Sequence, residues 1–385
     1  MSSYPPSGPP PTTTLRQRLA DLRGPAVPPR PLDARALAAL AANPGCGRRA
    51  LLDGAGVDKT ALAAALGSPA AFGQSQFAII RGNSFEARVK GDGGAELLRL
   101  VHEHLGAGSE PPGPGAQVPD LTAAGPEGRA ARTALALREA TAAAATSGTW
   151  TLLDHPMLAL EVAGSPAYLE PDAVVVHPDG RWTVVEIKSF PMIDGAADAA
   201  KVGAAARQAA VYVLALEKTA GKLASAVVGH SALLVCPKDF SNLPAAAPVD
   251  IRRERAVTRR QLERLTRVEE LAAALPEGLS FDPERTAEEL AEAVAAVSAA
   301  YAPECLAACE LAFHCRERAR AAGEVTALGR SVRGELGALT TVGEALAAAA
   351  GSGSGSGGPD DPTAASLHHA ARLRAEALEA AACPC

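Results

Sequence analysis

The most informative segment of this chain for its fold is YLEPDAVVVHPDGRWTVVEIK, from Tyr168 to Lys188. Its first part, 168–177, is rich in valine and bounded by proline, and its last part, 181–187, has the two-residue alternation of a strand. The intervening Pro178-Asp179-Gly180 is typical of a tight turn. We therefore predict a β-hairpin.

The turn sequence predicts which residues of the hairpin face each other. Proline cannot take the positive φ of a type I′ turn, so we expect a type I turn closed by Gly180 in the left-handed conformation. This loop pairs His177 with Arg181, so the numbers of facing residues sum to 358. Asp172 then lies opposite Glu186 on one face of the sheet.

Two carboxylates that face each other on neighbouring strands repel unless a cation lies between them. Mg²⁺ or Mn²⁺ fits Asp172 and Glu186 best, because hard divalent ions take oxygen ligands and keep waters, one of which can attack phosphorus. Lys188 shares their face, where it would orient that water or neutralise charge on a phosphate. Ile187 points into the core and leaves its carbonyl near the carboxylates. The alternative is a solvent-facing strand with an ordinary glutamate and lysine.

A helix is expected after the hairpin, with Asp194 as its N-cap and Gly221 at its end. Gln208 and Tyr212 lie four residues apart and share one face of this helix, as does Lys201. Taken alone, this pattern is that of an amphipathic helix that packs on the sheet with a polar edge.

The motifs of this region resemble those of a known family in order and spacing. Pro171-Asp172, Glu186-Ile187-Lys188 and Gln208 to Tyr212 resemble the P-D, E-x-K and Q-x3-Y motifs of the RecB-like family in the PD-(D/E)xK nuclease superfamily. Upstream, RGNSFE at 81–86 resembles the family's R-G-x3-H motif, with Glu86 in place of the metal-binding histidine.

This resemblance implies an α/β fold, a restriction-endonuclease-like core in which helices flank a mixed central sheet. It also implies two sets of site residues. The catalytic set is Asp172, Glu186, Lys188, Gln208 and Tyr212, the last two positioning the substrate or the lysine. The set that holds Mg²⁺ or Mn²⁺ is Glu86, Asp172, Glu186 and Ile187.

Cysteine placement offers a second line of inference. Seven cysteines, without a recognisable signal peptide or membrane span, are expected to be metal ligands or free thiols rather than disulfides. Cys305, Cys309 and Cys315 cluster late in the chain, whereas Cys46 stands alone near its start. The alternative for Cys305 and Cys309, four residues apart on an alanine-rich helix, is that they are small core residues.

A lone early cysteine with a late triplet resembles the iron-sulfur subset of the same family, which includes CRISPR-associated RecB-like nucleases. The family triplet C-x2-C-x5-C is C-x3-C-x5-C here. The resemblance implies a [4Fe-4S] cluster on Cys46, Cys305, Cys309 and Cys315, and a structural zinc ion would satisfy the same thiolates. Of the other cysteines, Cys236 is expected in the core, and Cys383 and Cys385 on a flexible tail.

Composition divides the chain into segments. A helix from Thr133, strands around 158–162 and 226–236, and a long loop over 106–128 are expected between them. The segments are a disordered Pro-rich tail (1–31), an N-terminal helical part with Cys46 and the first motif (32–128), the nuclease core (129–250), a helical region with the late cysteines (251–350), and a Gly/Ser linker with a helical tail (351–385).

The net charge of −6 argues against binding nucleic acid by bulk attraction. One predicted helix is nevertheless rich in arginine and would offer a row of contacts for phosphates. The alternative is that these arginines simply form the solvent-exposed face of the helix. Few aromatic residues are present for base stacking. The arginines are Arg252, Arg253, Arg255, Arg259, Arg260, Arg264 and Arg267.

These features together predict a metal-dependent DNA nuclease, expected to be an exonuclease on single-stranded DNA that acts in DNA repair or CRISPR-type defence. A cytoplasmic location is expected, with DNA and either a helicase or CRISPR adaptation proteins as partners and no membrane. The main alternative is a catalytically silent DNA-binding or assembly module of the same fold. A third reading is a structural zinc protein without nuclease activity.

Overall fold

The computed structural model of this protein describes residues 11–69, 76–106, 108–113, 115–162, 164–223, 226–239, 241–263, 267–352 and 361–382. The chain divides into two compact units. The first comprises the described parts of Met1–Pro44, Ala50–Gly56 and Phe72–Pro276, and the second those of Gly45–Arg49, Val57–Ala71 and Glu277–Cys385.

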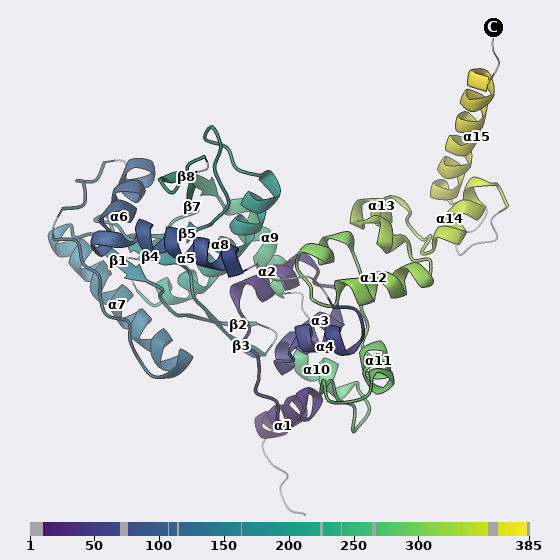
Figure 1. Cartoon of the computed structure of the whole chain (residues 1–385), viewed down its shortest axis with the longest axis horizontal. Helices are drawn as coiled ribbons and strands as arrows, with labels where there is room; N and C mark the ends of the chain where they lie inside the picture. The colour runs from purple at the N-terminus through teal and green to yellow at the C-terminus, as the bar shows by residue number, and fades with distance from the viewer. Residues whose placement is uncertain are drawn as a thin grey trace, which may run out of the picture. The chain divides into compact units, whose positions relative to one another are not determined.

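Helices make up most of both units (Figure 1). In the first unit they are α1 (Pro11–Arg23), α2 (Ala34–Ala42), α5 (Gln76–Val89), α6 (Gly91–Leu105), α7 (Gly125–Ser147), α8 (Ala199–Ala220), α9 (Arg252–Glu263) and α10 (Val268–Ala273). In the second they are α4 (Lys59–Ala65), α11 (Ala287–Ala295), the 3₁₀ helix η1 (Pro303–Ala307), α12 (Ala312–Ala321), the 3₁₀ helix η2 (Val325–Leu328), α13 (Arg330–Glu335), α14 (Val342–Ala349) and α15 (Pro362–Ala382). Helix α3 (Gly47–Ala55) contributes residues to both units.

A mixed sheet forms the centre of the first unit. Its strands follow the order β1 (Thr151–Asp154), β4 (Ala173–Val176), β5 (Arg181–Ile187), β7 (Ser231–Pro237) and β8 (Pro244–Asp250), and β6 (Val227–Val228) pairs with β5. The β5–β7 pair is parallel, and the pairs β1–β4, β4–β5 and β7–β8 are antiparallel. A separate hairpin consists of β2 (Leu158–Val162) and β3 (Ser165–Leu169).

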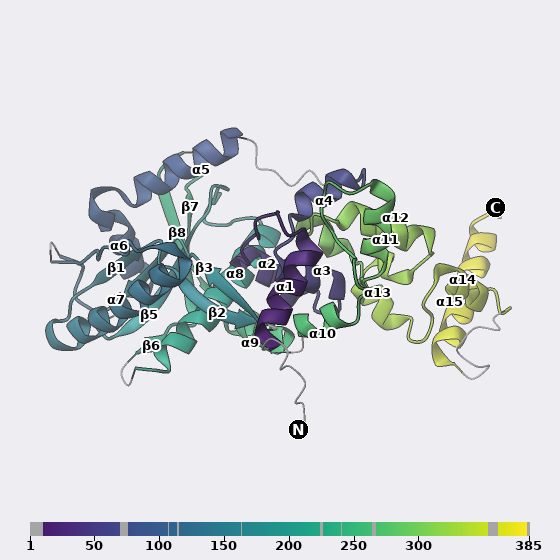
Figure 2. The same ribbon diagram turned by 90° about the horizontal axis from the view of Figure 1, so that it is seen from below.

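Helices cover both faces of this sheet, as expected for an α/β fold. Phe85 of α5 and Leu97 of α6 pack with Val175 on one face. Leu137 of α7 and Leu216 of α8 belong to the core on the other face, and Figure 2 shows α5 and α7 on opposite sides. Because both faces are buried, β4 is a continuous valine-rich run rather than an alternating one.

The predicted hairpin and its register are confirmed. Ala173 pairs with Val185 and Val176 with Trp182, so the numbers of facing residues sum to 358. The His177 N–H donates to the Arg181 carbonyl at 2.8 Å. Gly180 has a φ of 80°. The positive φ at the glycine lets a loop that contains proline return the chain in this register.

The predicted strand over 168–177 is wrong in one respect, because the chain forms two separate strands there instead of one continuous strand. Tyr168 belongs to β3, which pairs with β2 and not with the central sheet. Strand β4 begins only at Ala173, so Asp172 lies one residue beyond the last ladder pair. Pro171 has no N–H to donate to a ladder, which explains an interruption there.

The helix after the hairpin starts later than predicted. Its N-cap is Asp198, whose carboxylate accepts from the Lys201 N–H, and not Asp194, which has a φ of 50°. Gly221 is the C-cap, as predicted. Lys201 therefore lies in the first turn of α8.

The expectation of disorder over 1–31 is wrong for the described part of that stretch. Residues 11–23 form α1, and Leu22 is fully buried. Residues 1–10, most of the Gly/Ser segment (353–360) and the terminal Cys383 and Cys385 lie outside the described residues. The strand at 158–162 and the helical character of 251–350 agree with β2 and the helices from α9 to α14. The helix expected from Thr133 is present as α7, but it begins at Gly125, within the end of the stretch expected to be a loop over 106–128. No described helix is long and apolar enough to cross a membrane.

Candidate functional site

Glu186 is a carboxylate embedded in the central sheet. Its side chain is 2% exposed, and neither oxygen has a hydrogen-bond partner in the described part of the chain. Lys188 forms an ion pair with Oε2, without the geometry of a hydrogen bond. Burial and, to a smaller extent, the Asp172 carboxylate raise the pKa of Glu186 to about 7, even though the Lys188 ammonium lowers it. A buried carboxylate with free lone pairs is costly unless a cation or donor reaches it.

Asp172 is held beside Glu186 by a hydrogen bond that is not part of the β4–β5 strand pairing. Its Oδ2 accepts a hydrogen bond from the Ile187 N–H at 2.6 Å. The carboxylate thus replaces a strand partner just before the start of β4. Burial raises the pKa of Asp172, against the lowering effect of Lys188. The predicted convergence of the two acids is therefore present, with the Ile187 N–H as an unforeseen tether.

Lys188 connects the two acids. Its Nζ lies 3.9 Å from Asp172 Oδ2 and is paired with Glu186. Burial disfavours the ammonium, but Glu186 and Asp172 outweigh it and raise the pKa of Lys188. The Lys188 N–H donates to the Val235 carbonyl at 2.9 Å, which anchors the residue to β7. Ile187 is buried among core residues, as predicted.

Glu86 reaches the same region from α5. Its Oε1 accepts from Lys90 Nζ at 2.6 Å and lies 3.0 Å from His155 Nε2. The His155 hydrogen bond, with Lys90, lowers the pKa of Glu86 to about 2 despite burial. The Glu86 charge also acts on both Asp172 and Glu186. The predicted third acid therefore belongs to this electrostatic group, but it is already paired with basic side chains.

Three residues of this group were missed by reasoning from the sequence. Lys90, one helical turn after Glu86, donates to it and also lies 2.6 Å from the Asp154 Oδ1. His155 follows Asp154 at the end of β1, has a φ of 44° and donates its N–H to the Asp172 carbonyl at 3.3 Å. The i,i+4 spacing of Glu86 and Lys90 was a usable signal. Nothing local linked either residue to 154–155.

Gln208 and Tyr212 share one face of α8, as predicted. Gln208 Nε2 donates to the Tyr212 hydroxyl at 2.9 Å, and that hydroxyl donates to the Glu170 carbonyl at 3.2 Å. Tyr212 is buried in the core cluster of this sheet face. Burial raises the pKa of Tyr212, and the Glu186 and Asp172 charges raise it further, so the hydroxyl remains protonated beside the acids. These two hydrogen bonds hold the backbone segment that precedes Asp172 in place.

Among the described residues, no three His, Cys, Asp or Glu side chains are gathered as a formed metal cage. Glu186, whose oxygens have no hydrogen-bond partner among the described residues, and Asp172 nevertheless supply the hard oxygen donors that Mg²⁺ and Mn²⁺ prefer. The Lys188 ammonium partly offsets the negative charge of these two carboxylates. The donor set fits a hard divalent ion.

The four cysteines expected to act as ligands all belong to the second unit. Cys305 lies in η1, Cys315 in α12, and Cys46 immediately before α3. Cys315 influences the pKa of Cys309, and Cys46 and Cys305 influence that of Cys315, so the four cysteines share one region of the unit. Among the described residues, however, their side chains are not gathered as a formed metal-binding group. Cys305 and Cys309 are half-buried rather than core residues. Burial raises the pKa of Cys309 to about 11, with Arg49 opposing it.

Cys236 lies apart from this group. It is fully buried on β7, as predicted for a core residue. Burial raises the pKa of its thiol to about 12. A thiol of this kind is a packing group rather than a nucleophile.

The arginines expected to track phosphate are carried mainly by α9. The helix packs on α2 and α8, and its Thr258 is buried. Arg255 pairs with Glu217 at 2.5 Å, and Arg252 pairs with Asp250. Arg253, Arg259 and Arg260 are exposed. Arg264 lies outside the described residues.

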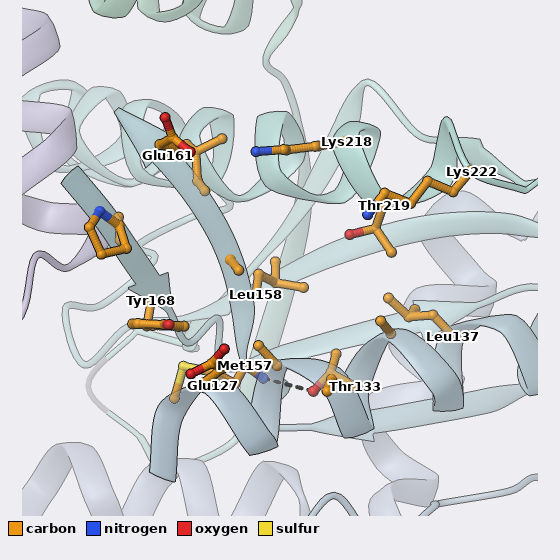
Figure 3. A pocket seen from close by; sticks show the side chains of 17 residues that line it. Glu127, Thr133, Leu137, Met157, Leu158, Glu161, Tyr168, Lys218, Thr219 and Lys222 are labelled. Carbon is orange, nitrogen blue, oxygen red and sulfur yellow. Dashed lines mark hydrogen bonds between the residues drawn. The ribbon is translucent and has the colours of Figure 1, made fainter. Parts of the chain in front are cut away.

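A pocket of about 420 Å³ opens elsewhere in the first unit, between α7, α8 and the β2–β3 hairpin. Leu158 and Met157 line it, together with Lys218 of α8 and Lys222, which follows the end of that helix (Figure 3). Neither Asp172 nor Glu186 lines it. The pocket was not foreseen from the sequence and is separate from the acidic group.

Comparison with known proteins found no matching family model, no matching curated protein and no matching solved structure.

Proposed function

We propose that this protein is a divalent-metal-dependent DNA nuclease with a PD-(D/E)xK core of the RecB-like type. The observation that carries the proposal is Glu186, a buried carboxylate beside Asp172 whose oxygens have no hydrogen-bond partner in the described part of the chain and whose only partner there is an ion pair with Lys188. Structural carboxylates are normally hydrogen-bonded when buried. An acid kept in this state, next to a second acid, is typical of a site that takes a cation.

Asp172 and Glu186 would hold Mg²⁺ or Mn²⁺, joined by Glu86 and the Ile187 carbonyl. When bound, the ion would polarise a phosphate and lower the pKa of a water molecule. Lys188, held between the acids, would orient that water or offset charge on the phosphate. Gln208 and Tyr212 would hold the chain at Glu170 and so position Asp172. The mixed sheet flanked by helices supports the fold assignment.

The four cysteines of the second unit form the second part of the proposal. Cys46, Cys305, Cys309 and Cys315 would hold a [4Fe-4S] cluster, or a zinc ion with the same thiolates. Their grouping in one unit, across a long separation in sequence, supports a shared ligand. The cluster is preferred on the strength of the motif resemblance.

DNA is the proposed substrate, cleaved as an exonuclease on single strands, in repair or CRISPR-type defence. The exposed Arg253, Arg259 and Arg260 of α9 would contact phosphates without reading bases. A helicase or CRISPR adaptation proteins are the partners that the resemblance implies.

The decisive experiment is cleavage of end-labelled single-stranded and duplex DNA by anaerobically purified protein with Mn²⁺. Parent protein should degrade the DNA, while Lys188→Ala and an EDTA-treated sample should not. Lys222→Ala, an exposed lysine on the rim of the separate pocket, is the matched control and should keep parental activity. Absence of cleavage by folded, metal-loaded parent protein would contradict the proposal.

One observation favours a second candidate, a catalytically silent DNA-binding or assembly module. Lys188 already pairs with Glu186, and Lys90 and His155 already pair with Glu86, so internal cations partly satisfy the acids. In that case the parent would bind single-stranded DNA but would bind no Mn²⁺ in a titration followed by electron paramagnetic resonance. Saturable Mn²⁺ binding would exclude the silent module in this form.

A further inference from the structure

A buried arginine without an acidic partner lies beside the cysteines of the second unit. Arg48 is 9% exposed, and its Nη1 donates to the Cys315 Sγ at 3.2 Å. Its Nη2 donates to the Val297 carbonyl at 3.1 Å. Its Nε is buried without a hydrogen-bond partner in the described part of the chain. No described carboxylate forms an ion pair with this guanidinium.

The position of Arg48 is built into the fold. Its N–H donates to the Ser298 carbonyl at 2.8 Å, so both backbone and side chain are held by the segment after α11. The next residue provides a contrast. Arg49 is also buried, but it donates to the Ala308 carbonyl at 2.6 Å and lies 4.0 Å from the Glu310 carboxylate. Of these adjacent cations, Arg49 therefore has a carboxylate nearby and Arg48 has a sulfur.

A buried guanidinium with no counter-anion is unfavourable, because the lost hydration is not replaced. A neutral thiol is only a weak acceptor and does not compensate for it. Four thiolates around a divalent ion or a [4Fe-4S] cluster, however, carry a net negative charge. The Arg48 environment is thus balanced when the cysteines hold such a group and unbalanced when they do not.

We propose that Arg48 is the positioning and charge-compensating residue of the cysteine centre. Its guanidinium orients the Cys315 sulfur and offsets the net negative charge of the thiolate-bound metal. This inference rests on the proposed metal centre at Cys46, Cys305, Cys309 and Cys315. Groups that hydrogen-bond a metal ligand commonly set the affinity of the site.

The test uses the full chain and Zn²⁺ as the probe for the thiolate set. Arg48→Met removes the charge and keeps most of the volume, Arg48→Lys keeps the charge, and Arg285→Met removes an exposed arginine of the same unit as the control. Two quantities are measured for each protein. They are the rate of Zn²⁺ transfer to a colorimetric chelator and the melting temperature with and without Zn²⁺.

Arg48→Met should release Zn²⁺ about tenfold faster than the parent, by the usual effect of losing a group that supports a ligand. Its metal-free form should melt at or above the parental temperature, because an uncompensated buried charge has gone. Its zinc-loaded form should melt below the loaded parent. Arg48→Lys should lie between the two, and Arg285→Met should match the parent.

Two results would overturn the role of Arg48. One is parental Zn²⁺ release by Arg48→Met, and the other is an equal fall in melting temperature with and without metal, which is the mark of a purely structural residue. A different result addresses the proposed centre itself. If the parent takes up no Zn²⁺ and behaves as Cys315→Ser does, the cysteine centre fails, and the inference fails with it.

Discussion

At the level of single residues, the three acidic side chains differ in their hydrogen-bond and ion-pair partners. Asp172 has a backbone donor, Glu86 has Lys90 and His155, and Glu186 has only an ion pair with Lys188. A cation that enters this group therefore gains most at Glu186, whose oxygens are otherwise unsatisfied.

Glu186→Gln should abolish stabilisation of the protein by Mn²⁺. A ligand that binds only the folded state stabilises it by about 2.7 kcal/mol at a hundred times Kd, which raises the melting temperature by several degrees. The parent should show this rise, and the variant should lose it because a neutral amide is a poor ligand. Differential scanning fluorimetry measures it, with the exposed Glu139→Gln as control. An equal Mn²⁺ shift in Glu186→Gln would remove that residue from the site.

His177 should make the first unit sensitive to acid. It is 0% exposed, its Nδ1 accepts from Arg181 at 3.3 Å, and its Nε2 lies 2.8 Å from the Thr183 hydroxyl. Because Arg181 is always a donor, Nε2 carries the proton and donates to Thr183. Burial lowers the pKa of His177 to about 4, and the nearby Arg181 charge acts in the same direction.

The unfolded chain binds a proton at this imidazole below about pH 6.5, whereas the folded chain does not until about pH 4. Stability should therefore fall as the pH drops through this window, by roughly 2 kcal/mol between pH 7 and pH 5. Urea unfolding followed by tryptophan fluorescence measures this, since Trp150 and Trp182 are both buried in the first unit. His177→Gln should flatten the dependence, and the exposed His104→Gln should not. Equal falls in all three proteins would contradict the assignment.

At the scale of elements, the hairpin shows why part of the site was predictable. Turn type and strand periodicity are local, so Pro178-Asp179-Gly180 determined the register that brings Asp172 and Glu186 to one sheet face. The start of α8 was misplaced because Asp194 and Asp198 are both acceptable N-caps, and only the local backbone path selects Asp198. The break before β4 was missed for a similar reason, since β3 finds its partner in a different sheet.

The exposed face of α9 should contribute to the salt dependence of DNA binding. Arg253, Arg259 and Arg260 are exposed, and each phosphate contact on a single strand contributes about 0.7 to the slope of log K against log salt. Replacing all three with glutamine should lower that slope by about 2. Fluorescence anisotropy with labelled oligothymidylate measures it. An equal charge change at the exposed Arg285, Arg372 and Arg374 is the control, and identical slopes for both triple variants would exclude α9 as the DNA track.

At the scale of the whole molecule, the two candidate centres belong to different compact units. The acids lie in the first unit, whose core spans both faces of the sheet, and the cysteines lie in the second, which has its own small core around Val325 and Leu339. Composition placed Cys46 with the segments around it, but its loop, Gly45–Arg49, belongs to the second unit. This assignment depends on long-range contacts that no local pattern records.

Cys315→Ser should therefore remove one centre and spare the other. If the proposed cysteine centre holds a metal in the parent, the variant should lose it, because one of the four proposed ligands is gone, while Mn²⁺ binding at Asp172 and Glu186, in the other unit, stays within about twofold. Elemental analysis and an Mn²⁺ titration measure the two effects. Cys236→Ser is the control for loss of a thiol outside the group. Retention of the full metal content would remove Cys315 from the ligand set.

The hairpin, its register and the presence of Asp172, Glu186 and Lys188 on one face followed from the amino-acid sequence alone, because turn chemistry and strand alternation act over a few residues. The hydrogen bond from Ile187 to Asp172 and the pairing of Lys90 and His155 with Glu86 became evident only from the folded chain. The same is true of the Arg48 contact with the Cys315 sulfur. These contacts join segments far apart in the chain, so their formation depends on how the core packs and not on any local propensity.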